Sequence, residues 1–170
     1  GLDDPDKVLP PGEKGQLVLS GANVMAGYWN KPEETVRTIV GGWLFTGDVG
    51  VMDEDGCVFL LDRLKDLIIS GGYNVYPRVI EEAIYQHPDV VAACVIGIPD
   101  DYRGQSPKAF VQLKPGAALT AEGLKDFLRD KISRIEMPKL IEFRAELPKT
   151  AVGKLSKKEL IAETLQKPEG

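Results

Sequence analysis

The sequence has few of the features that would place it in several common classes of protein. It contains two cysteines and one histidine in 170 residues, and its formal net charge is −5. No basic surface is available to meet a phosphate backbone, which argues against nucleic-acid binding. No apolar run approaches the length of a transmembrane helix, and the N-terminus lacks the pattern of a signal peptide. We therefore expect a cytoplasmic protein with no transmembrane segment and no nucleic-acid partner.

The two cysteines and the histidine offer little chemistry. Cys57 and Cys94 lie in strand-like apolar runs, and we interpret both as small buried side chains rather than disulfide partners. His87 precedes Pro88 at the end of a helical pattern, where a C-terminal cap is a better explanation than catalysis. We assign no metal ligand to this chain.

The first third of the chain is predicted to be rich in β-strands. Strands are expected near residues 15–20, 44–52 and 57–62, and the turn Asp53–Gly56 joins the last two as a hairpin. A short helix is predicted to start at Lys31 and to be ended by Gly41-Gly42. The apolar faces of this β-rich part are expected to need partners outside the chain.

From Lys65 onward, strand and helix patterns alternate. Helices are predicted over Pro77–Gln86, after Thr120 and after Ser156, and strands over Val90–Ile98, Lys108–Leu113 and Leu140–Phe143. With 43% hydrophobic residues the chain can build real cores. The predicted fold class is α+β, with a mixed sheet and flanking helices.

The stretch Asp62–Pro77 is the most informative part of the sequence. It reads Asp-Arg-Leu-Lys-Asp-Leu-Ile-Ile-Ser-Gly-Gly-Tyr-Asn-Val-Tyr-Pro, in which a short apolar run precedes two glycines. At Gly71 and Gly72 the chain can take positive φ, and a ligand can approach the backbone closely. Such a loop can carry chemistry, or it can be an ordinary surface turn.

This stretch resembles the hinge and glycine-loop motif of the adenylate-forming superfamily, and its form is closest to fatty-acyl-CoA ligases. Two further motifs agree in the family's order, Thr46-Gly47-Asp48 upstream and Leu147–Lys154 near the end. The resemblance covers essentially the whole chain, which would be the last third of such an enzyme. It implies that residues 1–64 are an incomplete β-rich subdomain of the large domain and that residues 65–170 are the small mobile C-terminal domain.

The resemblance also implies roles for single residues. Asp48 and Arg63 would hold the ribose of ATP or AMP, whereas an ordinary surface ion pair is the alternative for Arg63. Lys65 would be the hinge about which the small domain rotates. Lys154 would be the catalytic lysine that stabilises charge on the α-phosphate, although a solvated basic face would also account for it.

A second group of residues would serve CoA. The backbone at Ser70, Gly71 and Gly72 would approach the pantetheine arm of CoA. The basic residues considered for its phosphates are Arg78, Arg103 and Lys108, of which we select Arg103.

Together these roles predict the C-terminal part of an ATP-dependent acyl-CoA synthetase. Its cofactors would be ATP, CoA and Mg²⁺, with the Mg²⁺ ligands in the absent N-terminal part. Its partners would be a fatty acid or related carboxylate and the missing N-terminal domain, and the isolated chain would be inactive. The alternatives are an adenylation domain that loads a carrier protein, a non-catalytic binding module, and an α+β domain with chance motifs.

Overall fold

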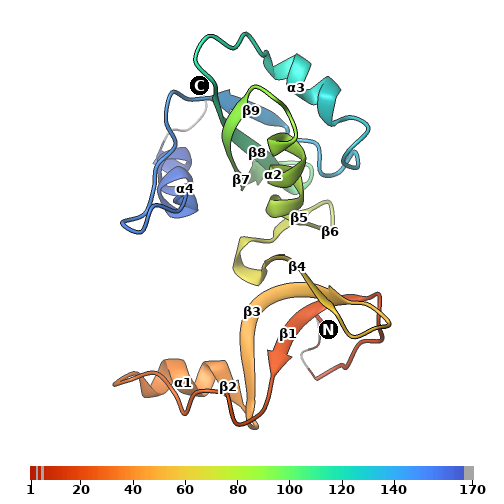
Figure 1. Ribbon diagram of the computed structural model, residues 1–170, viewed down its shortest axis with the longest axis vertical. Coiled ribbons are helices and arrows are strands. Elements are labelled where there is room, and N and C mark those ends of the chain that lie inside the picture. The colour runs from red at the N-terminus through yellow and green to blue at the C-terminus, as the bar shows by residue number, and fades with distance from the viewer. Residues whose placement is uncertain (3, 5, 167–170) are drawn as a thin grey trace. The chain divides into compact units, whose positions relative to one another are not determined.

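The structure, a computed structural model, describes residues 1–2, 4 and 6–166. The chain divides into two compact units, residues 1–65 and a second unit from Asp66 onward, which are described separately (Figure 1). The assignment of these units to two parts of an enzyme stays a prediction.

The first unit is built on a sheet of four antiparallel strands. Its elements are β1 (Lys14–Leu19), α1 (Pro32–Thr38), β2 (Ile39–Val40), β3 (Trp43–Met52) and β4 (Val58–Arg63). The long strand β3 pairs with each of the other three. Among the apolar side chains described in this unit, only Val49 is buried. The sheet therefore has almost no core of its own.

Two turns set the order of these strands. The predicted hairpin between β3 and β4 is confirmed, and Asp53 Oδ1 closes its turn by accepting hydrogen bonds from the backbone N–H groups of Asp55 and Cys57. The interpretation of Gly41-Gly42 as a helix end was wrong, because the helix ends at Thr38 and the two glycines form a tight turn between β2 and β3. The missed strand β2 has only two residues, too few for a periodic pattern to show.

The second unit contains a mixed five-stranded sheet. Its strands are β5 (Ile68–Ser70), β6 (Tyr73–Val75), β7 (Val90–Asp100), β8 (Gly104–Leu113) and β9 (Leu140–Phe143). The order β6-β5-β8-β7 is antiparallel throughout, and β9 pairs with β8 in parallel. The helices are α2 (Pro77–Tyr85), α3 (Ala121–Leu128) and α4 (Lys157–Gln166). The predicted α+β class is confirmed.

Helices cover both faces of this second sheet. Side chains of α2 and α3, such as Ile80 and Leu124, pack with Val95 of β7 in one apolar cluster. Leu160 of α4 packs with Phe110 of β8 in a second cluster. Successive strand residues point to opposite faces, so β7 is apolar at nearly every position, whereas β8 retains polar residues such as Gln105, Lys108 and Gln112. This explains why β7 is predictable as an apolar run, whereas β8 is predicted from the alternation over Lys108–Leu113.

Several predicted polar positions have structural roles. Helix α3 begins directly after Thr120, as predicted, and the Thr120 side chain caps it by accepting a hydrogen bond from Gly123 N at 3.1 Å. His87 follows α2, its Nδ1 accepts a hydrogen bond from Asp89 N, and its ring lies edge-on to Phe127.

The two cysteines have different surroundings. Cys94 is buried as predicted, and this burial, reinforced by the Glu81 carboxylate, raises the pKa of its thiol to about 12. The prediction for Cys57 was wrong, since it is exposed in the turn before β4. A turn residue has no opposing layer to cover it, and an apolar run does not show where the strand begins.

Candidate functional site

Asp48 and Arg63 face each other across strands β3 and β4. They are register partners, and Arg63 Nε lies 2.8 Å from Asp48 Oδ1. Just before Asp48 the β1–β3 register shifts, and Gly47 takes a φ of +73°. Thr46 Oγ1 fixes this irregularity, since it donates to Leu17 O at 2.8 Å and accepts from Asp48 N at 3.0 Å. The Thr-Gly-Asp tripeptide therefore sets the position of the carboxylate.

The Asp48–Arg63 pair is open to solvent. The Asp48 side chain is 27% exposed and that of Arg63 is 58% exposed. Exposed ion pairs contribute only about 0–1 kcal/mol to stability. The arrangement leaves a carboxylate acceptor beside a guanidinium donor, which suits the two hydroxyl groups of a vicinal diol. The structure brings these two predicted residues together, and their binding role stays a prediction.

Lys65 lies where the two units meet in the sequence. It belongs to a single turn of 3-10 helix, Leu64–Asp66, and it is the last residue of the first unit. Its side chain is exposed. A pivot at this position would change the backbone of a short turn without breaking a strand or a long helix.

The Gly71-Gly72 pair forms the turn of the β5–β6 hairpin. Their φ angles are +57° and +82°, and both central residues of a type I′ turn require positive φ. A Cβ atom on either glycine would have no neighbour within 4 Å. Within this unit, the turn geometry rather than crowding by neighbouring atoms requires glycine.

The glycine hairpin is joined to the turn between β7 and β8. Ser70 pairs with Gly104, and Gly71 N donates a hydrogen bond to Arg103 O at 2.8 Å. The Ser70 hydroxyl is buried and has no hydrogen-bond partner among the residues that the structure describes. Ser70, Gly71 and Arg103, which are all predicted to serve CoA, therefore meet at one end of β8.

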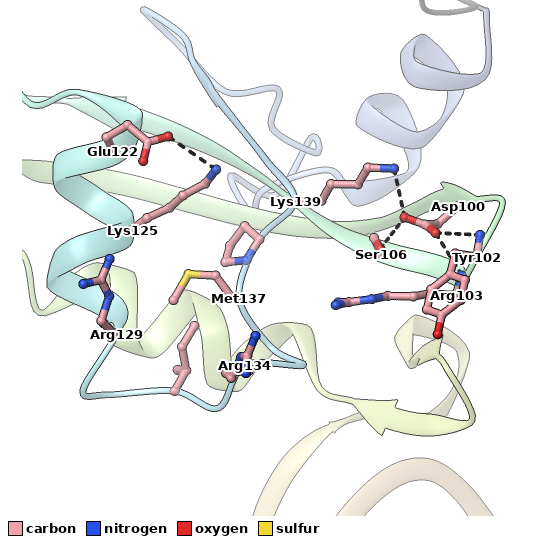
Figure 2. Close-up of a pocket in the computed structure, with 12 residues that line it drawn as sticks. Asp100, Tyr102, Arg103, Ser106, Glu122, Lys125, Arg129, Arg134, Met137 and Lys139 are labelled. Carbon is pink, nitrogen blue, oxygen red and sulfur yellow. Dashed lines mark hydrogen bonds and ion pairs between the residues drawn. The ribbon is translucent and has the colours of Figure 1, made fainter.

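A cavity of about 750 Å³ opens beside Arg103 within the second unit (Figure 2). Its charged lining is mainly basic. The basic side chains are Arg103, Lys125, Arg129, Arg134 and Lys139, and the acidic ones are Asp100 and Glu122. Ile132, Met137 and Pro138 contribute apolar surface. A cavity with this lining can hold an anionic ligand that also carries an apolar ring.

Asp100 organises one side of this cavity. Its Oδ2 accepts hydrogen bonds from Lys139 Nζ at 2.9 Å and Ser106 Oγ at 2.8 Å, and its Oδ1 accepts from the backbone N–H groups of Tyr102 and Arg103. The Lys139 contact, followed by the Arg103 and Ser106 hydrogen bonds, holds the pKa of Asp100 well below its usual range. Asp100 therefore stays ionised and fixes the turn that carries Arg103.

Lys154 lies at the end of a tight loop before α4. Lys149 pairs with Leu155 in an isolated bridge, Thr150 N donates to Lys154 O at 2.7 Å, and Gly153 N donates to Thr150 O at 2.8 Å. Gly153 takes a φ of +81°, which explains the glycine in this motif. Lys154 is exposed, and no ion pair or hydrogen bond to its Nζ occurs among the described residues.

Sequence reasoning missed most of the cavity. Lys139 reaches Asp100 because β9 pairs in parallel with β8, which brings Lys139 N within 2.8 Å of Pro107 O. A contact between residues so distant in the sequence leaves no local pattern. Lys108 is unsuited to a ligand, because its largely buried side chain pairs with Glu142 at 2.9 Å.

The described residues contain neither a candidate metal site nor a candidate membrane span. No group of three or more His, Cys, Asp or Glu side chains in this part of the chain could hold a metal ion. None of the described helices is long and apolar enough to cross a membrane.

Comparison with known proteins identifies the family. Residues 79–154 match the family described as AMP-binding enzyme C-terminal domain. The long-chain-fatty-acid–CoA ligase of Bacillus subtilis is 50% identical over 161 residues, which cover 95% of this chain and 29% of that protein. The chain belongs to the adenylate-forming superfamily. It corresponds to the C-terminal portion of such enzymes.

Other relatives in this superfamily differ in what their names say they act on. The 2-succinylbenzoate–CoA ligase of Geobacillus kaustophilus is 47% identical over 91% of this chain and 31% of that protein. A structure of o-succinylbenzoate CoA synthetase from Bacillus subtilis, in complex with an acyl-adenylate intermediate, has a TM-score of 0.86 and 32% identity, covering 98% of this chain and 33% of its own. An amide bond synthetase from Marinactinospora thermotolerans has a TM-score of 0.85 and 41% identity, covering 92% of this chain and 32% of its own.

The chain spans about a third or less of the length of these relatives.

Proposed function

We propose that this chain works as the C-terminal part of an ATP-dependent acyl-CoA ligase. A carboxylate would react with ATP to give an acyl-adenylate and pyrophosphate, and CoA would then displace AMP to give the thioester. The observation that carries the proposal is the meeting of the glycine hairpin with Arg103 beside a basic cavity. The names of the CoA ligase relatives support the same reaction class.

Asp48 and Arg63 would bind the ribose of ATP and AMP. The Asp48 carboxylate can accept hydrogen bonds from both ribose hydroxyls, and Arg63 Nε, 2.8 Å away, holds it in place. These residues fit a nucleotide. They do not supply Mg²⁺ ligands, so we assign the Mg²⁺ site to the N-terminal part of the enzyme.

Lys154 would serve the first half-reaction. Attack of a carboxylate on the α-phosphate brings two anions together and increases the charge on the non-bridging oxygens. A lysine held by a fixed loop can stabilise that charge, and loss of one such preorganised group typically costs about 2.7–4 kcal/mol in the transition state. The exposed position of Lys154 on its hydrogen-bonded loop supports this role.

Lys65 would allow the two half-reactions to use different arrangements of the two units. Residues 1–64 would belong to the large domain, and residues 65–170 would be the mobile domain. The exposed sheet of the first unit would be covered by the N-terminal part of the enzyme, since Trp43, Phe59 and Leu60 are each about half exposed here.

CoA would bind at the cavity of the second unit. Arg103 would contact its phosphates, Ser70, Gly71 and Gly72 would lie along the pantetheine arm, and the apolar surface of Met137 and Pro138 would face the adenine. We further propose a fatty acid as the carboxylate, because a long-chain-fatty-acid–CoA ligase is 50% identical to this chain.

The Lys154→Ala variant of the full-length enzyme tests the proposal through its two half-reactions. We expect carboxylate-dependent ATP–pyrophosphate exchange to fall by roughly 10²–10³. CoA attack on pre-made acyl-adenylate should be preserved, since Lys154 is assigned to the first step. Both rates can be measured by following radiolabelled pyrophosphate and acyl-CoA.

Lys149→Ala is the matched control. Lys149 has the same charge, is exposed, and lies in the same hydrogen-bonded loop. If the role of Lys154 depends on its position and not only on its charge, Lys149→Ala should change the rate of ATP–pyrophosphate exchange less than about twofold. If both substitutions lowered the exchange rate equally, Lys154 would be one residue of a solvated basic surface, and its catalytic role would be contradicted. Acyl-CoA synthesis by the purified 170-residue chain would overturn the proposal that this chain is inactive alone.

A different acceptor is the second candidate function. An amide bond synthetase is 41% identical to this chain and covers 92% of it, so an amine acceptor is compatible with this fold. A carrier protein is a further possible acceptor. If free CoA accelerates AMP release from the acyl-adenylate, CoA is the acceptor. If only an amine or a carrier protein does so, the CoA assignment fails.

A further inference from the structure

The basic side chains of the cavity differ in how their charge is balanced. Lys139 pairs with Asp100 at 2.9 Å, and Arg129 pairs with Asp126 at 2.6 Å. Lys125 lies 3.7 Å from Glu122. Three of the five cations are therefore already paired with carboxylates.

Arg103 and Arg134 are the remaining two. Within the described part of the chain, neither guanidinium makes an ion pair or a hydrogen bond, although both line the cavity. They come from different segments, Arg103 from the turn between β7 and β8 and Arg134 from the chain after α3 (Figure 2). Their positive charge is available to a ligand.

The backbone at both arginines is fixed by other residues. Asp100 Oδ1 accepts a hydrogen bond from Arg103 N at 2.9 Å. Ser133 and Glu136 close a turn around Arg134, because Glu136 N donates to Ser133 O, and Ser133 N and Oγ both donate to Glu136 Oε2. The acid nearest to Arg134 in the sequence is therefore used within the turn.

We propose that Arg103 and Arg134 clamp a phosphate monoester in this cavity, and that Arg134 lets the protein distinguish CoA from dephospho-CoA. This inference rests on the proposed CoA site and gives it a specificity-determining residue. The 3′-phosphate of CoA is a monoester with a charge near −2 and three acceptor oxygens, whereas each phosphate of its diphosphate carries about −1. Two guanidinium groups match the monoester better than one, since each can donate two parallel hydrogen bonds.

Titration of the 170-residue chain with CoA and with dephospho-CoA, followed by calorimetry at low salt, tests this. The wild-type chain should bind CoA more tightly than dephospho-CoA. Arg134→Ala should raise the Kd for CoA about tenfold, which corresponds to about 1.4 kcal/mol, and should change the Kd for dephospho-CoA less than about twofold. Arg134→Lys should give an intermediate Kd for CoA, because lysine retains the charge without the planar fork.

Arg37→Ala is the matched control, since it removes one arginine from the first unit and leaves the cavity intact. It should change neither Kd. Equal weakening of CoA and dephospho-CoA by Arg134→Ala would overturn the inference, because Arg134 would then contact the diphosphate. The inference would also be overturned if Arg134→Ala left both Kd values unchanged while Arg103→Ala raised both. The proposed CoA site would be supported in that case. If the wild-type chain bound neither ligand, the CoA site would fail and the inference with it.

Discussion

The two units of this chain are both built on β-sheets, but they bury their apolar residues to very different extents. Of the buried apolar side chains in the described residues, Val49 belongs to the first unit and all others to the second. In the first unit, Trp43, Met52 and Phe59 remain substantially exposed. In the second unit, helices cover both faces of the sheet.

This difference separates the candidate residues into two kinds. Arg103 and Lys154 belong to a unit with its own core, and hydrogen bonds within that unit fix the backbone at both residues. Asp48 and Arg63 lie on a sheet whose apolar surface is open, and we expect a covering part of the enzyme to complete their site. The comparison predicts that the same type of substitution has different effects in the two units.

The largest expected effect is from Phe110→Ala. Phe110 is fully buried in β8, and Lys108 Nζ and Arg144 Cζ lie 4.9 Å and 4.6 Å from its ring centre. Removing a buried phenylalanine ring typically costs about 3–5 kcal/mol of unfolding free energy. Urea unfolding followed by far-ultraviolet circular dichroism measures this loss.

Phe59→Ala is the matched substitution in the first unit. Phe59 is 56% exposed, so we expect a change within about 0.5 kcal/mol. Both tryptophans, Trp29 and Trp43, lie in residues 1–65, so tryptophan fluorescence reports on this unit alone. Equal losses from the two substitutions would contradict the difference between the units.

Sequence reasoning succeeded where the pattern is local. The α+β class, the Asp53–Gly56 hairpin and the start of a helix after Thr120 follow from periodicity and from residues a few positions apart. Strand β7 is recognisable as an apolar run because both faces of the sheet are covered. Strand β8 is recognisable from the alternation after Lys108, although it begins at Gly104, four residues before that predicted start. The polar end of β7 at Asp100 and the turn that carries Arg103 lack these patterns.

The candidate site was predictable only in part. Asp48, Arg63 and Lys154 belong to motifs with a recognisable order, and the structure shows that Asp48 and Arg63 are in contact. Arg134 and Lys139 belong to no such motif. They reach the cavity because α3 and the parallel strand β9 return the chain to the β7–β8 turn, which is a result of topology rather than of spacing.

Gly72→Ala is expected to have an intermediate effect on the unfolding free energy of the second unit, and Gly42→Ala is its counterpart in the first unit. The two units contain turns of the same geometry, since Gly42 and Gly72 both have a φ of +82° and a Cβ on either would meet no atom within 4 Å. The cost of alanine is therefore that of the left-handed conformation, roughly 1–2 kcal/mol. Gly72→Ala should lower the unfolding free energy of the second unit by that amount.

Gly42→Ala should alter the fluorescence of Trp43, which follows it directly, and leave the circular-dichroism transition of the second unit unchanged. A shift of that transition by Gly42→Ala would mean that the units unfold together. The difference in burial would then not make them independent.

The smallest expected effect is from Glu142→Gln, through pH. Burial tends to raise the pKa of Glu142, but hydrogen bonds from Lys108 and Arg144 outweigh it and lower that pKa below its usual range. In the window between the lowered folded value and the unfolded value near 4.3, the unfolded state binds more protons, so unfolding free energy rises with pH. The stabilisation is present above about pH 4.3 and is lost as pH falls through the folded pKa.

Because the Glu142 side chain is 40% exposed, solvent screening limits the contribution to about 0–1 kcal/mol. Urea unfolding midpoints at several pH values between about 6 and 3 measure how steeply the unfolding free energy changes with pH. We compare this slope and not the absolute stability, because Glu142→Gln also leaves Lys108 without its ion-pair partner. Glu142→Gln should flatten the slope. Glu33→Gln, whose partner Arg37 is 4.0 Å away on the exposed face of α1, should not. Equal slopes in wild type and Glu142→Gln would show that the ion pairs of the second unit are as weakly coupled to folding as those of the first.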